Sequence, residues 1–330
     1  KRRPYPMSFQ IDSHYQAPIN SLWQGRSDSA ENERIFQVIK NIDLHSQTID
    51  SLEKGLIIIG FASDEGVKRN LGRTGAKEGP NSIRLQLGKL PYFNELKLYD
   101  VGNIQCLNND LEYAQIALGK LIAYCHKLGH KTLILGGGHE TAWGHYLGLK
   151  DRYPDLGIVN FDAHFDLRDL NISTSGTPFM QIAKDKKILN QSFDYFCYGT
   201  QQTANTKSLF ETANSLDVHY LSQNKINQTT LDWQLNYVED FIDQKNSIYL
   251  TICMDVFNAS VAPGVSAPQP MGIMPSQLMP VLQYILNSKK VVSADLVELS
   301  PKYDKDDITA RLASSLAAEI IFNSKELSNE

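Results

Sequence analysis

Short apolar runs alternate with amphipathic segments along most of the chain after residue 50. The apolar runs predict eight strands, at Leu56–Ala62, Leu96–Val101, Thr132–Leu135, Gly157–Phe161, Tyr195–Tyr198, Val218–Leu221, Ser247–Cys253 and Val291–Asp295. The amphipathic segments predict helices at Glu31–Ile42, Leu111–Leu128, Thr206–Ser215, Thr230–Ile242, Ser276–Asn287 and Asp307–Phe322. Several strand runs are continuously apolar or β-branched, which is typical of strands buried on both faces. The alternation therefore predicts a mainly parallel sheet of about eight strands covered by helices.

The chain shows no composition break, repeat or long linker between residues 50 and 325, so we predict a single domain over residues 51–330. Residues 1–50 are more irregular, and we interpret them as an N-terminal extension. Residues 1–6 precede Met7, and we interpret them as a cloning remnant, with Met7 as the natural start.

The composition of the chain narrows the range of possible functions. Apolar residues make up 42% of the 330, enough for a sizeable core, and a net charge of −5 argues against nucleic acid as the main partner. No apolar run reaches membrane-spanning length. The four cysteines form no Cys-x-x-Cys pair, as expected of free thiols in a reducing cytoplasm.

Three candidate metal ligands, Asp162, His164 and Asp166, follow the strand predicted at Gly157–Phe161. Alternate side chains of an extended chain share a face, so the three converge if the strand continues past the sheet edge. Carboxylate oxygens with an imidazole suit a divalent ion such as Mn²⁺ better than a closed structural zinc site. A solvated acidic loop is the alternative.

Three further polar groups follow predicted strands: the run Gly136–Glu140 with His139, then Asp255 after Cys253, and Glu298 after Asp295. The carboxyl ends of parallel strands meet at one edge of a sheet, where open α/β folds bind ligands. The sequence therefore predicts one site at this edge.

Together these motifs resemble the ureohydrolase superfamily of arginases, agmatinases and formimidoylglutamases, over roughly residues 50–325. The resemblance implies a three-layer α/β/α fold and a site for two manganese ions. It implies that His139, Asp162 and Asp166 bind one ion, and that Asp162 bridges to a second ion bound by His164 and Asp255.

The third motif departs from the family pattern, because Cys253 stands where most members have a bridging Asp and Asn258 where a later Asp is usual. Sulfur is a soft ligand, whereas Mn²⁺ prefers oxygen. Cys253 can be a working ligand, the second ion can bind weakly, or the site can hold a single ion. The alternative is that Cys253 is only a small buried residue.

The expected chemistry is hydrolysis of an amidine. Two adjacent ions lower the pKa of a shared water, and the resulting hydroxide can attack an amidine carbon. Glu298 matches the family's substrate-binding Glu and can receive the amidinium in a bidentate hydrogen bond. Asp166 is the expected proton shuttle beside the hydroxide.

Two features resemble formimidoylglutamases in particular: the run from Asp64 to Arg73, and Arg168 just after the metal motif. Residues 173–179 lack the His that arginases carry there. N-formimino-L-glutamate has two carboxylates, for which Arg168, Arg69 and Arg73 are candidate partners, with Asn205 as a further donor. The implied reaction releases L-glutamate and formamide, a step in histidine breakdown.

Three alternatives stay open: an agmatinase-like or other guanidino-acid ureohydrolase, a metal-impaired homologue without activity, and an enzyme inactivated by oxidation of Cys253. The family often forms homo-oligomers. The sequence itself leaves the oligomeric state undetermined.

Overall fold

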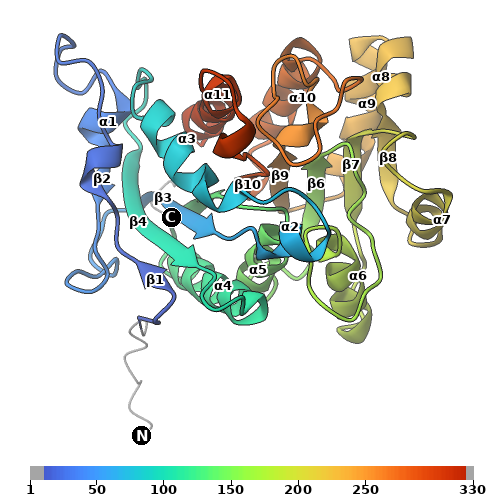
Figure 1. Ribbon diagram of the computed structural model, residues 1–330, viewed down its shortest axis with the longest axis horizontal. Helices are drawn as coiled ribbons and strands as arrows, with labels where there is room; N and C mark the ends of the chain where they lie inside the picture. Colours follow the sequence, from blue (N-terminus) through green and yellow to red (C-terminus); the bar gives the residue numbers. More distant parts are fainter. Residues whose placement is uncertain (1–10, 325–330) are drawn as a thin grey trace, which may run out of the picture.

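A ten-stranded, mainly parallel sheet lies between two layers of helices (Figure 1). The computed structural model describes residues 11–324, so the prediction for residues 1–6 lies outside the described part of the chain. The strands are β1 (Tyr15–Gln16), β2 (Lys40–Asn41), β3 (Gly55–Ala62), β4 (Lys97–Gln105), β5 (Lys131–Leu135), β6 (Gly157–Phe161), β7 (Tyr195–Thr200), β8 (His219–Ser222), β9 (Ile248–Cys253) and β10 (Val291–Val297). All eight predicted strands are present, and two short edge strands are added to them.

The spatial order of the strands is β1-β4-β3-β5-β10-β9-β6-β7-β8, with β2 also paired to β4. Among the strands of residues 11–324, only β1 runs antiparallel to its neighbour. The last strand of the chain, β10, lies between β5 and β9 and thus joins the earlier strands into one sheet.

The α-helices are α1 (Ile35–Val38), α2 (Glu65–Arg69), α3 (Gly79–Leu87), α4 (Leu111–Lys127), α5 (Thr141–Leu149), α6 (Pro178–Ile188), α7 (Lys207–Ser215), α8 (Gln223–Gln228), α9 (Leu231–Ile242), α10 (Pro275–Asn287) and α11 (Ile308–Asn323). Short 3-10 turns form η1 (Asn20–Leu22), η2 (Ala76–Glu78), η3 (Met254–Val256) and η4 (Pro301–Tyr303).

Each sheet face has its own helical layer and its own apolar core. Helices α3, α9, α10 and α11 pack on one face, and α4, α5, α6 and α7 on the other (Figure 1). Strand β3 supplies both cores: Leu56 and Ile58 point into one, and Ile57 and Ile59 into the other. This alternation is the period of two expected of a strand, and it confirms a three-layer α/β/α fold.

The helix predicted over residues 31–42 is wrong. Only α1 is helical there, Ile39 is already extended, and β2 pairs with β4 through Tyr99 and Asp100. Ile35 and Ile42 are nonetheless buried. The apolar spacing is therefore satisfied by one helical turn and an edge strand, because strand pairing and packing outweigh a weak local helix preference.

A hydrogen bond from Trp23 links the N-terminal residues to a buried ion pair between α3 and β4. The Arg84 guanidinium donates two hydrogen bonds to Asp100, at 2.9 and 2.8 Å, and Trp23 Nε1 donates to the same carboxylate at 2.8 Å. Residues 15–49 thus pack on the edge of the sheet. The domain boundary at residue 50 stays a prediction.

None of the helices in residues 11–324 combines the length and apolar character that crossing a bilayer requires.

Candidate metal and active site

Four neighbouring strands in the middle of the sheet position the side chains of the candidate site. His139 follows β5, Glu298 follows β10, Cys253 ends β9 and Asp162 follows β6, in the spatial order β5-β10-β9-β6. These strands are parallel, so their carboxyl ends meet at one edge, as the sequence predicts.

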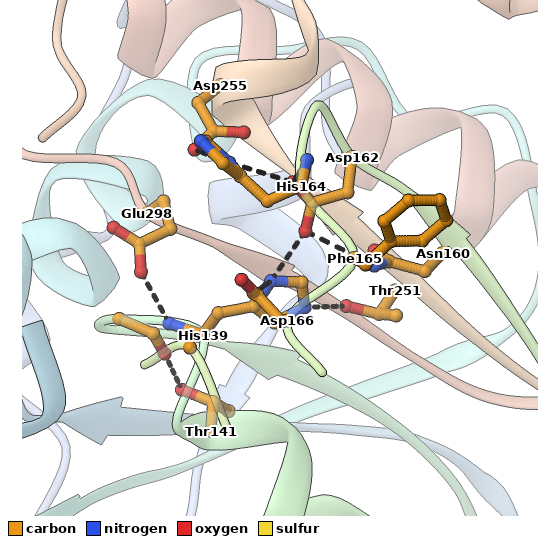
Figure 2. Close-up of polar contacts among 12 residues, drawn as sticks. His139, Thr141, Asn160, Asp162, His164, Phe165, Asp166, Thr251, Asp255 and Glu298 are labelled. Carbon is orange, nitrogen blue, oxygen red and sulfur yellow. Dashed lines mark hydrogen bonds and ion pairs between the residues drawn. The ribbon is translucent and has the colours of Figure 1, made fainter. Parts of the chain in front are cut away.

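His139 lies at the centre of the site, and only 1% of it is exposed (Figure 2). Its backbone N–H donates to Glu298 Oε1 at 2.6 Å, and its Nε2 lies 3.0 Å from Thr251 Oγ1. Its Nδ1 lies 2.9 Å from Asp162 Oδ2 and 2.9 Å from Asp166 Oδ2. The preceding turn requires glycine at 137, since a Cβ there would come within 1.8 Å of Ser63 O.

The side chains of Asp162, His164 and Asp166 are brought together by a turn of the chain and not by the extended strand that the sequence predicts. Strand β6 ends at Phe161, so the expected extended continuation is wrong. The chain instead turns back, with Asp166 at a φ of 51°, in the left-handed region. Asn205 holds the turn: its Nδ2 donates to Ala163 O at 2.9 Å and its Oδ1 accepts from Phe165 N at 3.0 Å.

Two side-chain triads result, and they share Asp162. One consists of His139, Asp162 and Cys253, and the other of Asp162, His164 and Asp255; within each triad the candidate ligand atoms lie within 4.8 Å of one another. Asp166 adjoins the first triad through its contact with His139. Two cation positions with one bridging carboxylate fit this arrangement.

The donor atoms are also left free for a cation. His139 Nδ1 and Asp255 Oδ1 are buried, and no described residue completes a hydrogen bond to either, although two carboxylate oxygens lie close to Nδ1. Buried polar atoms are normally paired, so these two point to a missing partner. The residues present therefore fit a pair of divalent ions bound mainly by oxygen and imidazole.

Burial and crowded carboxylates shift the ionisation of the site. Burial opposes charge on His139, but Asp162 and Asp166 outweigh it and raise the histidine pKa. Burial and the neighbouring Asp162 raise the pKa of Asp166 to about 6. Burial, then the surrounding carboxylates, raise the pKa of Glu298 and of the Cys253 thiol. The metal-free site therefore holds excess protons that a bound cation would displace.

Glu298 faces the same centre from the end of β10, also with a left-handed backbone, at a φ of 71°. Its N–H donates to Gly137 O at 2.8 Å, which fixes the turn. Oε1 accepts from His139 N, and Oε2 accepts from no described residue. A carboxylate oxygen can accept more than one hydrogen bond, so the bidentate contact with an amidinium stays a prediction.

A pocket of about 370 Å³ opens onto the centre. Glu298, Asp166, His164, Asp255 and Cys253 line its floor. Its remaining lining comes mainly from the loops after β3, β6, β7 and β9.

The three candidate arginines have different positions. Arg168 lines the pocket, and no acceptor among residues 11–324 hydrogen-bonds its guanidinium. Arg73 also lines it, but its guanidinium donates to Val265 O and Ser266 O and stacks on Tyr303. Arg69 is outside the pocket lining and donates to Glu112, Asn109 O and Ser173 O. The structure therefore brings Arg168 and Arg73 to the pocket lining but not Arg69.

Asn205 lines the pocket too, but its amide is committed to the loop contacts described above. It supports the metal loop and offers no free donor to a substrate.

Sequence reasoning missed Asn70, whose Oδ1 is buried without a partner among the described residues and which lines the pocket beside Arg168. Gly176 separates them: a Cβ there would lie 3.0 Å from Arg168 Cδ and 3.0 Å from Asn70 Oδ1. The glycine allows both side chains to approach each other. Asn70 lies within the run from Asp64 to Arg73, but the sequence assigned it no role, because its approach to Arg168 depends on Gly176, more than a hundred positions away.

A buried hydrogen-bonded chain behind His139 was also missed. Thr251 contacts His139 Nε2 and Tyr249, and Tyr249 donates to Asp295 Oδ2. The same oxygen pairs with His145 Nδ1 at 2.7 Å. A hydrogen bond on Nε2 leaves Nδ1 of His139 for the cation site, which is how outer partners orient a histidine ligand.

Comparison with known proteins identifies the family. The sequence model of the arginase family matches residues 54–323. Formimidoylglutamase of Legionella pneumophila (strain Lens) is 48% identical over 312 residues, covering 94% of this chain and 98% of that protein. The protein of the same name from Chromobacterium violaceum is 43% identical over 305 residues, covering 90% and 96%.

Two solved structures share the fold. Bacillus subtilis formimidoylglutamase matches with a TM-score of 0.78 at 22% identity, over 100% of this chain and 97% of that chain. Trypanosoma cruzi formiminoglutamase with Mn²⁺ matches with a TM-score of 0.74 at 24% identity, over 83% and 95%. The extent of the sequence match and the shared architecture establish that this chain belongs to the arginase family.

Proposed function

We propose that this protein hydrolyses N-formimino-L-glutamate to L-glutamate and formamide in a manganese-dependent reaction. The observation that carries the proposal is the pair of triads sharing Asp162, beside a pocket lined by Arg168, whose guanidinium has no hydrogen-bond acceptor among residues 11–324. The curated relatives named formimidoylglutamase, up to 48% identical across nearly the whole chain, support the same substrate.

We assign one manganese ion to His139, Asp162, Asp166 and Cys253, and a second to Asp162, His164 and Asp255. When bound, the ions supply Lewis acidity and lower the pKa of water in the site. The assignment agrees with the donor atoms that converge there.

Glu298 orients the substrate. Its free Oε2 accepts a hydrogen bond from the cationic formimino nitrogen, while His139 N keeps Oε1 in place. The pocket floor thus holds the electrophilic carbon next to the cation site. A cationic amidinium also favours the ionised form of Glu298, against the burial that raises its pKa.

Asp166 moves the proton. Its carboxylate lines the pocket and lies 2.9 Å from His139 Nδ1, so it can accept a proton from the attacking water and return it to the departing nitrogen. The water oxygen ends in formamide, and glutamate leaves as the free amine.

Arg168 selects the acidic substrate. Its guanidinium binds a substrate carboxylate, whereas the second cation of agmatine would be repelled. Asn70 Oδ1, which is buried beside it without a partner among residues 11–324, accepts from an N–H of the substrate's formimino group.

We further propose a cytoplasmic location, because all four cysteines are free thiols, as expected in a reducing compartment. We also propose that the enzyme forms a homo-oligomer, as members of the superfamily often do.

The test is hydrolysis of N-formimino-L-glutamate, agmatine and L-arginine by metal-stripped protein, with and without added Mn²⁺. We expect manganese-dependent formamide release from the first substrate alone. Urea release from either of the other two would replace the proposed substrate. Absence of hydrolysis of all three substrates with manganese bound would favour a homologue without activity.

A further inference from the structure

Cys253 lies where an oxygen ligand is usual, and its position is that of a ligand rather than of a core residue. It ends β9 opposite Val297 of β10 and is only 1% exposed. Its Sγ lies within 4.8 Å of a ligand atom of His139 and of Asp162. The carboxyl ends of β5, β9 and β6 therefore bring an imidazole, a sulfur and a carboxylate close together.

We propose that Cys253 is a thiolate ligand of the ion held by His139 and Asp162, and that it gives this centre a preference for thiophilic divalent ions over Mn²⁺ that the Asp variant lacks. The inference rests on the proposed metal site but not on the identity of the substrate. The thiol proton leaves to the solvent as the sulfur–metal bond forms.

The surroundings of the sulfur argue against a packing role. Burial alone suits a cysteine in an apolar niche, yet Cys253 borders the carboxylates of Asp162, Asp255 and Glu298. Asp162 and Asp255 are themselves candidate ligands in the second triad. A side chain kept only for its size has no reason to face three acids.

The other buried thiols provide the contrast. Cys125 belongs to the apolar core under α4. Cys197 points its sulfur at the backbone oxygens of Asp162 and His164, at 3.9 and 3.4 Å, and joins neither triad. The approach of sulfur to a histidine and a carboxylate is thus specific to Cys253 among the buried thiols.

Sulfur changes which ion the centre prefers. Thiolate is a soft donor and favours ions such as Cd²⁺, Zn²⁺ and Co²⁺, whereas carboxylate favours Mn²⁺. The remaining imidazole and carboxylate ligands still accept Mn²⁺, so manganese can support turnover while competing poorly with softer ions. Replacement by Asp should shift the ratio of Mn²⁺ to Cd²⁺ affinity by about tenfold or more.

The experiment titrates metal-free protein with Cd²⁺ and follows the ultraviolet absorption band that arises from charge transfer between a thiolate and the metal. We expect the band to appear in proportion to bound Cd²⁺, as measured by equilibrium dialysis. The variants C253D and C253S should bind the ion without the band. The triple variant C106S/C125S/C197S, which keeps Cys253 as its only thiol, should retain the band.

Competition between Mn²⁺ and Cd²⁺ gives the second readout, with C125S as a matched control for loss of a buried thiol. Bound Cd²⁺ without the band in the unaltered protein, or a band that persists in C253D, would overturn the proposal. Manganese-dependent formamide release together with that result would reject sulfur ligation alone. Failure to bind any divalent ion would reject the metal site as well.

Discussion

Replacing Arg168 by Ala tests the substrate assignment most directly. Arg168 lines the pocket with its guanidinium unengaged among the described residues, so its removal breaks no structural contact of that group. Hydrogen bonds to a charged partner contribute about 1.5–3 kcal/mol. Arg168 is exposed, and screening limits the loss to about one such bond, which corresponds to roughly a 10- to 150-fold higher KM. The kcat should change little, because the carboxylate contact is the same in ground and transition states.

The assay is steady-state formamide release from N-formimino-L-glutamate at saturating Mn²⁺. Arg69→Ala is the matched control, since Arg69 donates to Glu112 and to two backbone oxygens and is outside the pocket lining. Its KM should stay close to that of the unaltered protein. An unchanged KM for Arg168→Ala, or an equal rise in the Arg69 control, would refute the argument that the unpaired guanidinium is the one that binds substrate.

Three other perturbations test separate parts of the structure. Asp166→Asn keeps the shape but removes the proton shuttle, and kcat should fall by about 10²-fold or more; substantial retained turnover would contradict both assigned roles. Asp100→Ala leaves the Arg84 charge buried without its carboxylate, so urea denaturation should give a free energy of unfolding lower by about 3–5 kcal/mol. The double replacement Arg84→Leu/Asp100→Leu should cost less, and an equal loss would argue against an unpaired charge as the cause. Burial raises the pKa of Glu140 from 4.5 to about 7, so the folded protein holds a proton there that the unfolded chain releases. Stability from this group is present below pH 4.5 and lost as pH rises through 7, by about 3 kcal/mol in the metal-free protein. Glu140→Gln should flatten that part of the stability profile in thermal or urea unfolding, and an unchanged slope would exclude Glu140 as its source.

The strands and the ligand motifs were the most predictable features. Runs such as 56–62 place apolar residues, among them three Ile, on both faces, as expected of a strand covered on both sides. The ligands then follow from adjacency, since each lies directly after such a run. The local hydrophobic pattern gave a wrong helix prediction at residues 31–42, where strand pairing with β4 determines the conformation of residues 40–41. It also missed α6, because a Ser-Gly-Thr-Pro run suggests a loop, although Pro178 starts the helix.

The contacts of the substrate pocket were less predictable for a different reason. Whether an arginine is free depends on acceptors far away in the chain. Glu112 engages Arg69 from 43 positions along the chain, and Val265 O engages Arg73 from 192 positions away. The sequence can identify three arginines as candidates for binding a substrate carboxylate. Only the folded structure shows which guanidinium has no hydrogen-bond acceptor among the described residues.

The place of β10 in the sheet bears on how the protein matures. Strands β1 to β5 and β6 to β9 form two separate ladders, which only β10 joins. A nascent chain on the ribosome therefore carries two unconnected half-sheets, each with an unpaired inner edge, until residues 291–297 emerge. His139 belongs to one half and Asp162 to the other, so the ligands cannot be aligned before synthesis is nearly complete. Metal binding is thus a late event in folding. A chain truncated before β10 should expose two unpaired strand edges, which chaperones would have to protect, and should lack the assembled metal site.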